Sequence, residues 1–324
     1  MQTSLETRRL GATDMEITRV GFGAWAVGGG DWKFGWGPQD DDASIAAIRR
    51  ALELGINWID TAAVYGFGHS EEVVARALAG RSERPYVFTK CGLLPDGEGG
   101  TREDISRDSV VRECDASLRR LRVEALDLYQ IHWPTDDPSD IDGGWAAMES
   151  LRQAGKVREI GVSNFDVGEL ERAGKIAPVA SLQPPYSLVK REIEAEILPY
   201  CRDRGIGVIV YAPMQSGLLT GAMTRERAAA LPESDWRTKN AEFTEPKLSQ
   251  NLALVERLRS VGARYGRSPG EVAIAWTLRD PGVTGAIVGA RGAAQIEGTI
   301  GAAALQLSPD DIREIEARPA SLAG

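Results

Sequence analysis

Four polar side chains that could move a proton stand at the ends of apolar segments in the first half of the chain. They are Asp60, Tyr65, Lys90 and His132. The first two lie at and just after the segment Asn57–Ala62, the third ends Tyr86–Lys90, and the fourth lies near the end of Leu126–Trp133. If these segments are parallel strands, all four side chains meet at one face, where barrel enzymes carry their active sites.

Together these side chains could deliver a proton to a carbonyl oxygen whose carbon accepts a hydride. A tyrosine hydroxyl has a pKa of about 10, and a neighbouring ammonium lowers it by favouring the phenolate. We expect Lys90 to lower the pKa of Tyr65 in this way, while Asp60 holds Lys90 in place. His132 could donate a hydrogen bond to the substrate oxygen. Taken singly, each residue also has a structural explanation, such as a helix cap or a buried core histidine, so the conjunction carries the hypothesis.

The elements that must position these groups alternate between strand-like runs and amphipathic helical stripes. The predicted strands are Ile17–Trp25, Asn57–Ala62, Tyr86–Lys90, Leu126–Trp133, Glu159–Asn164, Ser181–Tyr186, Gly207–Pro213 and Ala286–Gly289. Helices are expected between them, among them Trp145–Ala154, Ile193–Arg204 and Pro269–Arg279, and later Ala293–Ala303. Residues Ser216–Glu245 form a long irregular connection, and Ser308–Ala317 is an extra helix with Ser308 as its N-cap.

Eight such units predict an α/β fold, a TIM (β/α)8 barrel with an N-terminal β-hairpin and extra C-terminal helices. We expect one domain over residues 1–324, because no linker interrupts the pattern. An open doubly wound sheet is the alternative. It would require a G-x-G-x-x-G turn after an early strand. Gly21-Phe22-Gly23 is instead followed by Ala24-Trp25-Ala26, so that fingerprint is absent.

Composition limits the possible partners. The 324 residues carry a net charge of −9, which disfavours nucleic acid or an anionic membrane as the main partner. Three cysteines without a C-x-x-C pair fit a reducing compartment, and no apolar run reaches about 18 residues, so we expect a cytoplasmic protein. Only His69 and His132 are present, and catalytic zinc sites usually take two or three histidines, so no metal site is expected. His69 lies in a loop and is given no catalytic role.

Three segments carry a resemblance to a known family. They are Asn57–Ala62 followed by Val64-Tyr65-Gly66, the stretch Gly155–Phe165, and Val288-Gly289-Ala290-Arg291. Together they resemble the aldo-keto reductases, in the style of the bacterial and potassium-channel β-subunit-like branches, and the likeness covers nearly the whole chain. The resemblance implies a metal-independent oxidoreductase that reduces an aldehyde or ketone by direct hydride transfer from a nicotinamide cofactor. A nicotinamide-binding regulatory or scaffold protein with little turnover is the alternative.

The resemblance also implies roles for individual residues. Asp60, Tyr65, Lys90 and His132 fall on the family's catalytic tetrad, with Tyr65 as the general acid. The residues that fall on the cofactor site are Trp25, Asp60, Ser163, Asn164, Gln183, Tyr211, Pro213, Met214, Gln215, Ser216, Gly217, Leu218, Arg237, Gly289, Arg291 and Gln295. Within this set, Ser163, Asn164 and Gln183 match the contacts to the carboxamide, Tyr211 matches the ring stacked on the nicotinamide, and Pro213–Leu218 match the pyrophosphate loop.

The adenosine end decides between NADP and NAD. Arg291 falls where the family binds the 2′-phosphate, and a guanidinium suits that group, so we expect NADPH, with NADH still possible. Two departures weaken the expected hold on the adenosine half. Gly221-Ala222 stands where the family often has Gly-Lys, and Gly298-Thr299 replaces an adenine-facing Glu-Asn pair.

The expected substrate pocket is lined by Trp25, Tyr65, His132 and Trp133. Further aromatic residues in the loops on the same face are Trp32, Phe34, Trp36 and Phe67. An aromatic mouth suits an apolar or ring-containing carbonyl, or a sugar-like compound stacked on a ring. Neither the individual substrate nor the oligomeric state can be predicted from the sequence.

Overall fold

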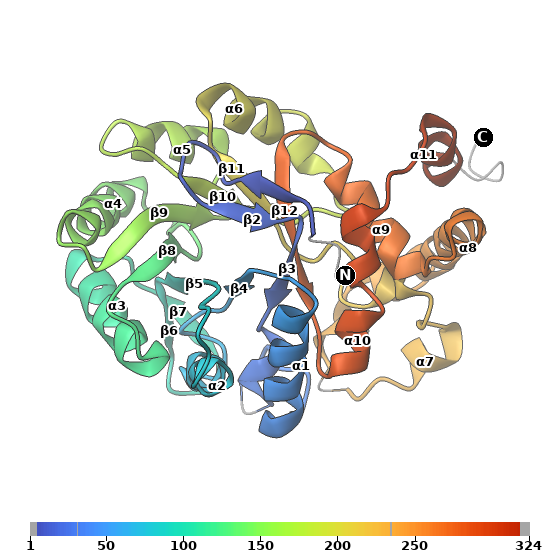
Figure 1. Cartoon of the computed structure of the whole chain (residues 1–324), viewed down its shortest axis with the longest axis horizontal. Coiled ribbons are helices and arrows are strands. Elements are labelled where there is room, and N and C mark those ends of the chain that lie inside the picture. The colour runs from blue at the N-terminus through green and yellow to red at the C-terminus, as the bar shows by residue number, and fades with distance from the viewer. Residues whose placement is uncertain (1–4, 31, 234, 318–324) are drawn as a thin grey trace.

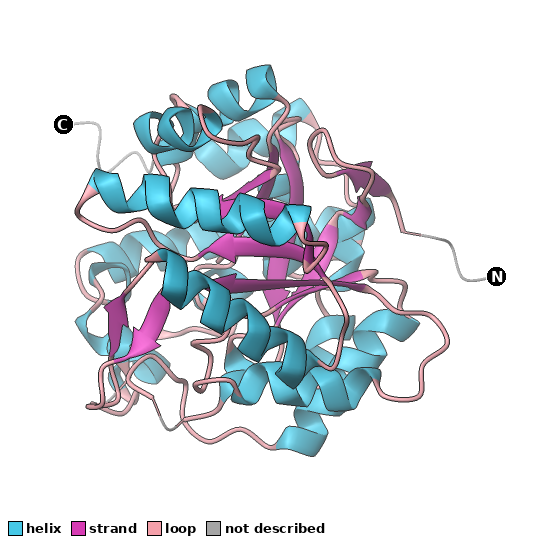
Figure 2. Ribbon diagram, turned by 90° about the vertical axis from the view of Figure 1, so that its left-hand side faces the viewer, coloured by secondary structure: helices cyan, strands magenta, loops and turns pink. Residues whose placement is uncertain are grey.

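The computed structural model describes residues 5–30, 32–233 and 235–317, and its centre is a closed barrel of eight parallel strands (Figures 1 and 2). Around the barrel the strands follow the order β10-β11-β12-β3-β4-β5-β8-β9. Their bounds are β3 Val20–Gly23, β4 Trp58–Asp60, β5 Tyr86–Cys91, β8 Leu126–Ile131, β9 Val157–Ser163, β10 Ser181–Gln183, β11 Gly207–Val210 and β12 Val283–Gly289. The predicted TIM barrel is confirmed.

Helices surround the barrel, as Figure 1 shows. The α-helices are α1 Asp41–Glu53, α2 His69–Leu78, α3 Arg107–Leu121, α4 Pro138–Gln153, α5 Val167–Gly174, α6 Ile197–Arg204, α7 Arg225–Ala229, α8 Lys247–Tyr265, α9 Pro269–Leu278, α10 Ala293–Glu297 and α11 Pro309–Glu316. The 3-10 helices are η1 Ala26–Gly28, η2 Glu192–Glu194, η3 Leu218–Thr220, η4 Trp236–Lys239, η5 Ala241–Phe243 and η6 Ile300–Ala304.

Local sequence explains how these helices begin. The Asp40 side chain accepts a hydrogen bond from Ala43 N at the start of α1, and Ser268 and Ser308 form capping boxes at α9 and α11. Both serines are followed by proline, which lacks the N–H that the first helical turn leaves unpaired. Ser308 is therefore the N-cap that the sequence predicts.

Two hydrophobic layers hold the barrel together. The inner layer fills the barrel with Trp58, Phe88, Leu128 and Ile209, and the larger outer layer lies between the strands and the helices. The inner layer also includes Leu10, Met15 and Ile17, from the hairpin formed by β1 (Thr7–Arg9) and β2 (Glu16–Thr18). The hairpin crosses one end of the barrel in Figure 1 and closes it with apolar side chains.

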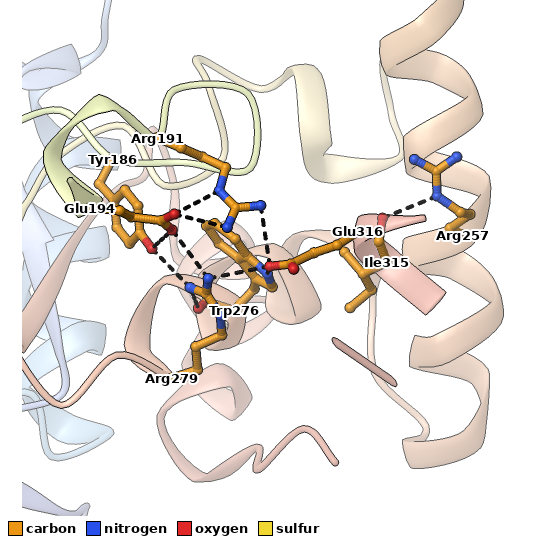
Figure 3. A network of polar contacts seen from close by, with 8 residues as sticks. All are labelled: Tyr186, Arg191, Glu194, Arg257, Trp276, Arg279, Ile315 and Glu316. Carbon is orange, nitrogen blue, oxygen red and sulfur yellow. Dashed lines mark hydrogen bonds and ion pairs between the residues drawn. The ribbon is translucent and has the colours of Figure 1, made fainter. Parts of the chain in front are cut away.

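The far C-terminal helix is fastened to the barrel by a polar network around Trp276 (Figure 3). The guanidinium of Arg279 lies 3.6 Å from the centre of the Trp276 ring and donates to Tyr186, Glu194 and Glu316. The Trp276 indole N–H also donates to Glu316, at 3.0 Å. Because Glu316 ends α11, these contacts join α11 to α9 and to the segment that follows β10.

Several predicted elements have different bounds in the structure. The expected strand Ile17–Trp25 is two strands, β2 and β3, because its first part pairs with β1 in the hairpin. The expected helix Ala293–Ala303 is divided into α10 and η6 at Gly298, and the expected helix Ile193–Arg204 begins as η2 before α6. The antiparallel pair β6 (Leu93–Pro95) and β7 (Thr101–Glu103) is not predicted, and the long connection contains α7 and three 3-10 helices.

Candidate active site

A buried lysine joins an aspartate to a tyrosine at the carboxyl ends of β4 and β5. Lys90 Nζ donates to Asp60 Oδ2 at 2.6 Å, to the Thr61 carbonyl at 2.9 Å and to the Tyr65 hydroxyl at 3.3 Å. The Lys90 side chain is fully buried, and that of Asp60 is 4% exposed. The ammonium thus satisfies all three of its donors within the site, which compensates for the loss of water around it.

Burial sets the direction of the pKa values in this group. Burial lowers the pKa of Lys90, although Asp60 opposes the change. Burial and then the charge of Asp60 raise the pKa of Tyr65 well above its usual value. The net lowering of the Tyr65 pKa that the sequence suggests is not found, because burial of the hydroxyl and the charge of Asp60 outweigh the nearby ammonium. Tyr65 keeps its proton at neutral pH and can donate it.

His132 lies beside Tyr65, with the two ring centres 5.7 Å apart in an edge-to-face arrangement. Burial lowers the pKa of His132 well below its usual value, and the charge of Lys90 lowers it further. The imidazole is consequently neutral at pH 7 and has one N–H to donate. Its backbone is fixed by a bond from its N–H to Cys91 O and by another from Asn164 Nδ2 to its carbonyl.

The residues expected at the carboxamide are joined to the tetrad by hydrogen bonds, of which one reaches a tetrad side chain. Gln183 Nε2 donates to the free oxygen of the Asp60 carboxylate at 2.8 Å, and Ser163 Oγ donates to Gln183 O. Asn164 adopts a positive φ of 63° and accepts a hydrogen bond from the Tyr211 hydroxyl at 2.9 Å. Strands β9, β10 and β11 thus bring these four side chains to the same face as the buried lysine.

The segment expected to wrap a pyrophosphate has an uncommon backbone. Gln215, Ser216 and Gly217 have positive φ values of 47°, 52° and 90°. Within the described residues, neither the Ser216 N–H nor the Gly217 N–H donates to another group. Successive unpaired N–H groups of this kind form a concave site for an anion.

The neighbouring positions of this segment frame it. Pro213 and Met214 precede the three residues, and Leu218 is buried at the start of η3. Arg237 reaches back to the Ser216 carbonyl at 3.3 Å while it pairs with Asp235 at 2.6 Å. The long connection is therefore joined to the segment that it covers.

Arg291 lies beyond the end of β12, two residues after Gly289. Its guanidinium donates to the Gln39 side chain at 2.6 Å and to the carbonyls of Pro38 and Trp36. Gln295 accepts from the Arg291 backbone N–H at 2.7 Å. Within the described chain no carboxylate pairs with Arg291, so its charge is held in place by neutral oxygens only.

An aromatic rim surrounds the group formed by Tyr65, Lys90 and His132. Trp25 contacts Trp36 at 5.2 Å and Trp236 at 6.3 Å between ring centres. On another side, Trp32 packs on Tyr65, with 6.0 Å between the two ring centres. Phe34 and Phe67, which pack on Trp32, are the more exposed members of this rim, and Trp133, directly after His132, is also exposed. Trp25, Tyr65, His132 and Trp133 each follow the carboxyl end of a barrel strand. That they line a substrate pocket stays a prediction.

The sequence did not indicate the residues that support this group from behind. Glu71 of α2 is completely buried and accepts from Thr89 Oγ1 at 2.6 Å and from Arg120 Nε at 2.6 Å. Because Thr89 precedes Lys90, this contact fixes the end of β5. In the sequence, the one signal for this role of Glu71 was its place near apolar residues of the helix that follows Tyr65. His69, given no role, bonds to Asp41 on α1.

Two further observations bear on the kind of chemistry. In residues 5–30, 32–233 and 235–317, no group of three or more His, Cys, Asp or Glu side chains could hold a metal ion. The same residues include no helix long and apolar enough to cross a membrane.

The chain is similar to reductases and dehydrogenases over nearly its whole length. The family model described as the Aldo/keto reductase family matches residues 19–318. The chain is 36% identical over 313 residues to Aldo-keto reductase YhdN of Bacillus subtilis (strain 168), covering 96% of this chain and 92% of that protein. It is 34% identical over 315 residues to the NADH-specific methylglyoxal reductase of Escherichia coli (strain K12), covering 93% and 94%.

A solved structure has the same fold. The glycerol dehydrogenase AKR11B4 from Gluconobacter oxydans superimposes with a TM-score of 0.87 at 37% identity. The match covers 96% of this chain and 94% of that one.

Proposed function

This chain belongs to the aldo/keto reductase family of oxidoreductases, and we propose that it reduces a small aldehyde or ketone with NADPH, using Tyr65 as the general acid. The observation that carries the proposal is the buried ammonium of Lys90, bonded both to Asp60 and to the Tyr65 hydroxyl. A charge buried so completely is costly, and proton transfer to a substrate oxygen gives it a use.

The residues present fit a nicotinamide dinucleotide. Ser216 and Gly217 offer backbone N–H groups suited to a pyrophosphate, and Tyr211 offers a ring that can stack on the nicotinamide. Ser163, Asn164 and Gln183 offer donors and acceptors for the carboxamide. When bound, the nicotinamide supplies the hydride that reduces the carbonyl carbon.

The protein's own residues then handle the proton. Tyr65, protonated at neutral pH, donates its proton to the oxygen that gains negative charge. The Lys90 ammonium, 3.3 Å from the Tyr65 oxygen, stabilises the phenolate as it forms, and Asp60 keeps Lys90 aimed at it. The neutral His132 donates a hydrogen bond to the same substrate oxygen, which orients the carbonyl.

The preference for NADPH rests on Arg291. Within the described residues its guanidinium meets only neutral oxygens, so a 2′-phosphate would give it an anionic partner. The Escherichia coli relative is named NADH-specific, so family membership alone does not decide the preference. The scaffold alternative is not favoured, because the similar proteins are named reductases and dehydrogenases.

Replacement of the tyrosine tests the catalytic assignment. Tyr65→Phe should lower kcat for an aldehyde by about 10²- to 10⁴-fold, the usual contribution of a positioned acid, while NADPH affinity is unchanged. Stopped-flow absorbance of NADPH and quenching of tryptophan fluorescence measure the two quantities. Tyr200→Phe, on α6 away from the site, is the matched control. Wild-type turnover in the Tyr65→Phe variant would remove the assigned role.

The cofactor assignment has its own test. Arg291→Ala should weaken NADPH binding by about 10- to 100-fold and leave NADH binding nearly unchanged, because only NADPH carries the 2′-phosphate. Arg50→Ala is the control. Arg50 lies close to α10, the helix that follows Arg291, but it is already paired with Glu297 of that helix at 2.6 Å. An equal loss for both cofactors in Arg291→Ala would rule out the 2′-phosphate contact.

A further inference from the structure

One amide inside the barrel is buried at a cost that the proposed mechanism does not explain. Gln130 of β8 is completely buried, and it follows Leu128 of the inner layer by two positions, so both side chains lie on the inner face. Within the described residues its Nε2 has no hydrogen-bond partner. Buried donors are nearly always paired, and an unpaired one lowers stability. An apolar side chain would fill this place in the core without that loss.

Gln130 stands in a row with two small residues of the neighbouring strands. It is in register with Gly161 of β9, which is in register with Ser181 of β10. A Cβ on Gly161 would lie 3.4 Å from Gln130 Cγ and 2.3 Å from Ser181 Oγ. Gln183 follows Ser181 by two positions and shares its face of the strand. Because Gly161 has no side chain, Gln130 can reach across β9 to Gln183.

The contact between the two amides has a definite direction. Gln183 Nε2 donates one N–H to Gln130 Oε1 at 3.4 Å and the other to Asp60 Oδ1 at 2.8 Å. An amide nitrogen has two N–H groups, so both are used. Within the described chain no group donates to Gln183 Oε1. Turning this amide by 180° would direct its oxygen at two acceptors, so Gln130 and Asp60 together fix which end remains free.

We propose that Gln130 is a positioning residue for the cofactor: it orients the amide of Gln183 so that Oε1 accepts an N–H of the nicotinamide carboxamide. The inference rests on the proposed function, in which Gln183 contacts that carboxamide. Gln130 acts through Gln183 alone. Without its Oε1, one of the two acceptors that hold the amide is lost, and the oxygen of Gln183 is no longer kept towards the carboxamide.

A cofactor analogue tests this orientation. The 3-acetylpyridine analogue has a methyl group in place of the carboxamide nitrogen, so it cannot donate to Gln183 Oε1. Wild type should bind the natural dinucleotide about 10-fold more tightly than the analogue, which corresponds to one hydrogen bond. Quenching of tryptophan fluorescence measures both dissociation constants, with NADP or NAD according to which one wild type binds more tightly. Equilibrium binding is unaffected by the different redox potential of the analogue.

Gln130→Met keeps the length of the side chain and removes both polar ends. The ratio of the two dissociation constants should fall below about threefold in this variant, because the amide of Gln183 has lost one acceptor. Its urea midpoint should be equal to that of wild type or higher, because fewer buried donors are left unpaired. Gln130→Leu is a second apolar variant and should behave in the same way.

A matched control removes another unpaired buried group. Ser117, on α3 outside the barrel, is completely buried, and its Oγ also lacks a partner in the described chain. Ser117→Ala should likewise keep or raise the urea midpoint, but its ratio of dissociation constants should stay at the wild-type value of about 10. The ratio therefore separates a role in orientation from an effect of core polarity.

Three results would overturn the inference. The first is a wild-type protein that binds the dinucleotide and the analogue equally. The second is a ratio in Gln130→Met and Gln130→Leu that equals the wild-type ratio. The third is a lower urea midpoint in both variants, or failure of both to fold, because Gln130 would then be retained for stability. If wild type binds neither NADP nor NAD, the proposed function itself fails, and the inference fails with it.

Discussion

Replacing the buried carboxylate of Glu113 should change how stability depends on pH. Glu113 lies on α3 and is 7% exposed. Both of its oxygens accept from the backbone N–H of Gly92, at 3.1 and 3.2 Å, and Ser109 adds a weaker contact at 3.3 Å. Gly92 follows β5 two residues after Lys90, so this carboxylate anchors the strand end that carries the buried lysine.

Burial raises the pKa of Glu113 from 4.5 to about 7, against the opposing effect of the Gly92 N–H. Between these pKa values the folded protein holds a proton that the unfolded chain has released. Stability therefore falls as the pH rises from about 4.5 to 7, and the loss is complete above that range. A difference of about 2.5 between the two pKa values corresponds to about 3 kcal/mol of unfolding free energy.

Glu113→Gln keeps a carbonyl oxygen for Gly92 but cannot ionise. We expect the free energy of unfolding of wild type to fall by about 3 kcal/mol relative to this variant between pH 4.5 and 8. Urea denaturation at a series of pH values, followed by circular dichroism, measures the difference. Glu171→Gln, at an exposed position on α5, is the control and should show no such trend. Parallel profiles for wild type and Glu113→Gln would refute the reasoning.

Two further replacements test the support of the site and of the fold. A Cβ on Gly28 would lie 2.7 Å from Tyr65 C, so Gly28→Ala should shift Tyr65 and lower kcat by about 10- to 100-fold with unchanged circular dichroism. Gly174→Ala, with open space around it, should not; equal rates in the two variants would contradict the expectation. Arg279→Ala should lower the urea-derived unfolding free energy by about 2–3 kcal/mol, because three polar partners and the Trp276 ring lose it. Arg313→Ala, whose side chain is 71% exposed, should cost less than about 1 kcal/mol, and a similar loss in both would count against the network.

The grouping of Asp60, Lys90 and His132 could be predicted because a parallel barrel brings all strand ends to one face. Only the alternation of elements and the polar residue at each strand end were needed. The bounds of short elements could not be predicted in the same way. Leu93–Pro95 and Thr101–Glu103 are three-residue strands joined by a turn rich in glycine, and so short a run has no periodicity to detect.

The electrostatics of the site needed coordinates. The direction of the pKa change at Tyr65 depends on how completely the hydroxyl is buried and on the pairing of Asp60 with Lys90, which no spacing in the sequence encodes. The same holds for Glu71 and Glu113. A glutamate on an amphipathic helix is most often solvated, and these two are buried because their partners, Thr89 and Gly92, come from the strand beneath.

The position of Arg291 changes what the two departures at the adenosine end imply for cofactor binding. By the resemblance, the replacement of a Glu-Asn pair by Gly298-Thr299 is expected to remove polar contacts to the adenine. The guanidinium of Arg291, however, is bonded to Trp36, Pro38 and Gln39. Because those acceptors are neutral, they orient the guanidinium without cancelling its charge, and an oriented charge loses less entropy when an anion binds.

The same short segment continues back to Trp32, which covers Tyr65. Residues 32–39 therefore connect the acceptors that hold Arg291 to the ring that packs on Tyr65. Substitutions that alter cofactor preference at Arg291 act on a loop that also contributes Trp32. The proposed preference for NADPH and the packing around Tyr65 therefore depend on the same piece of chain.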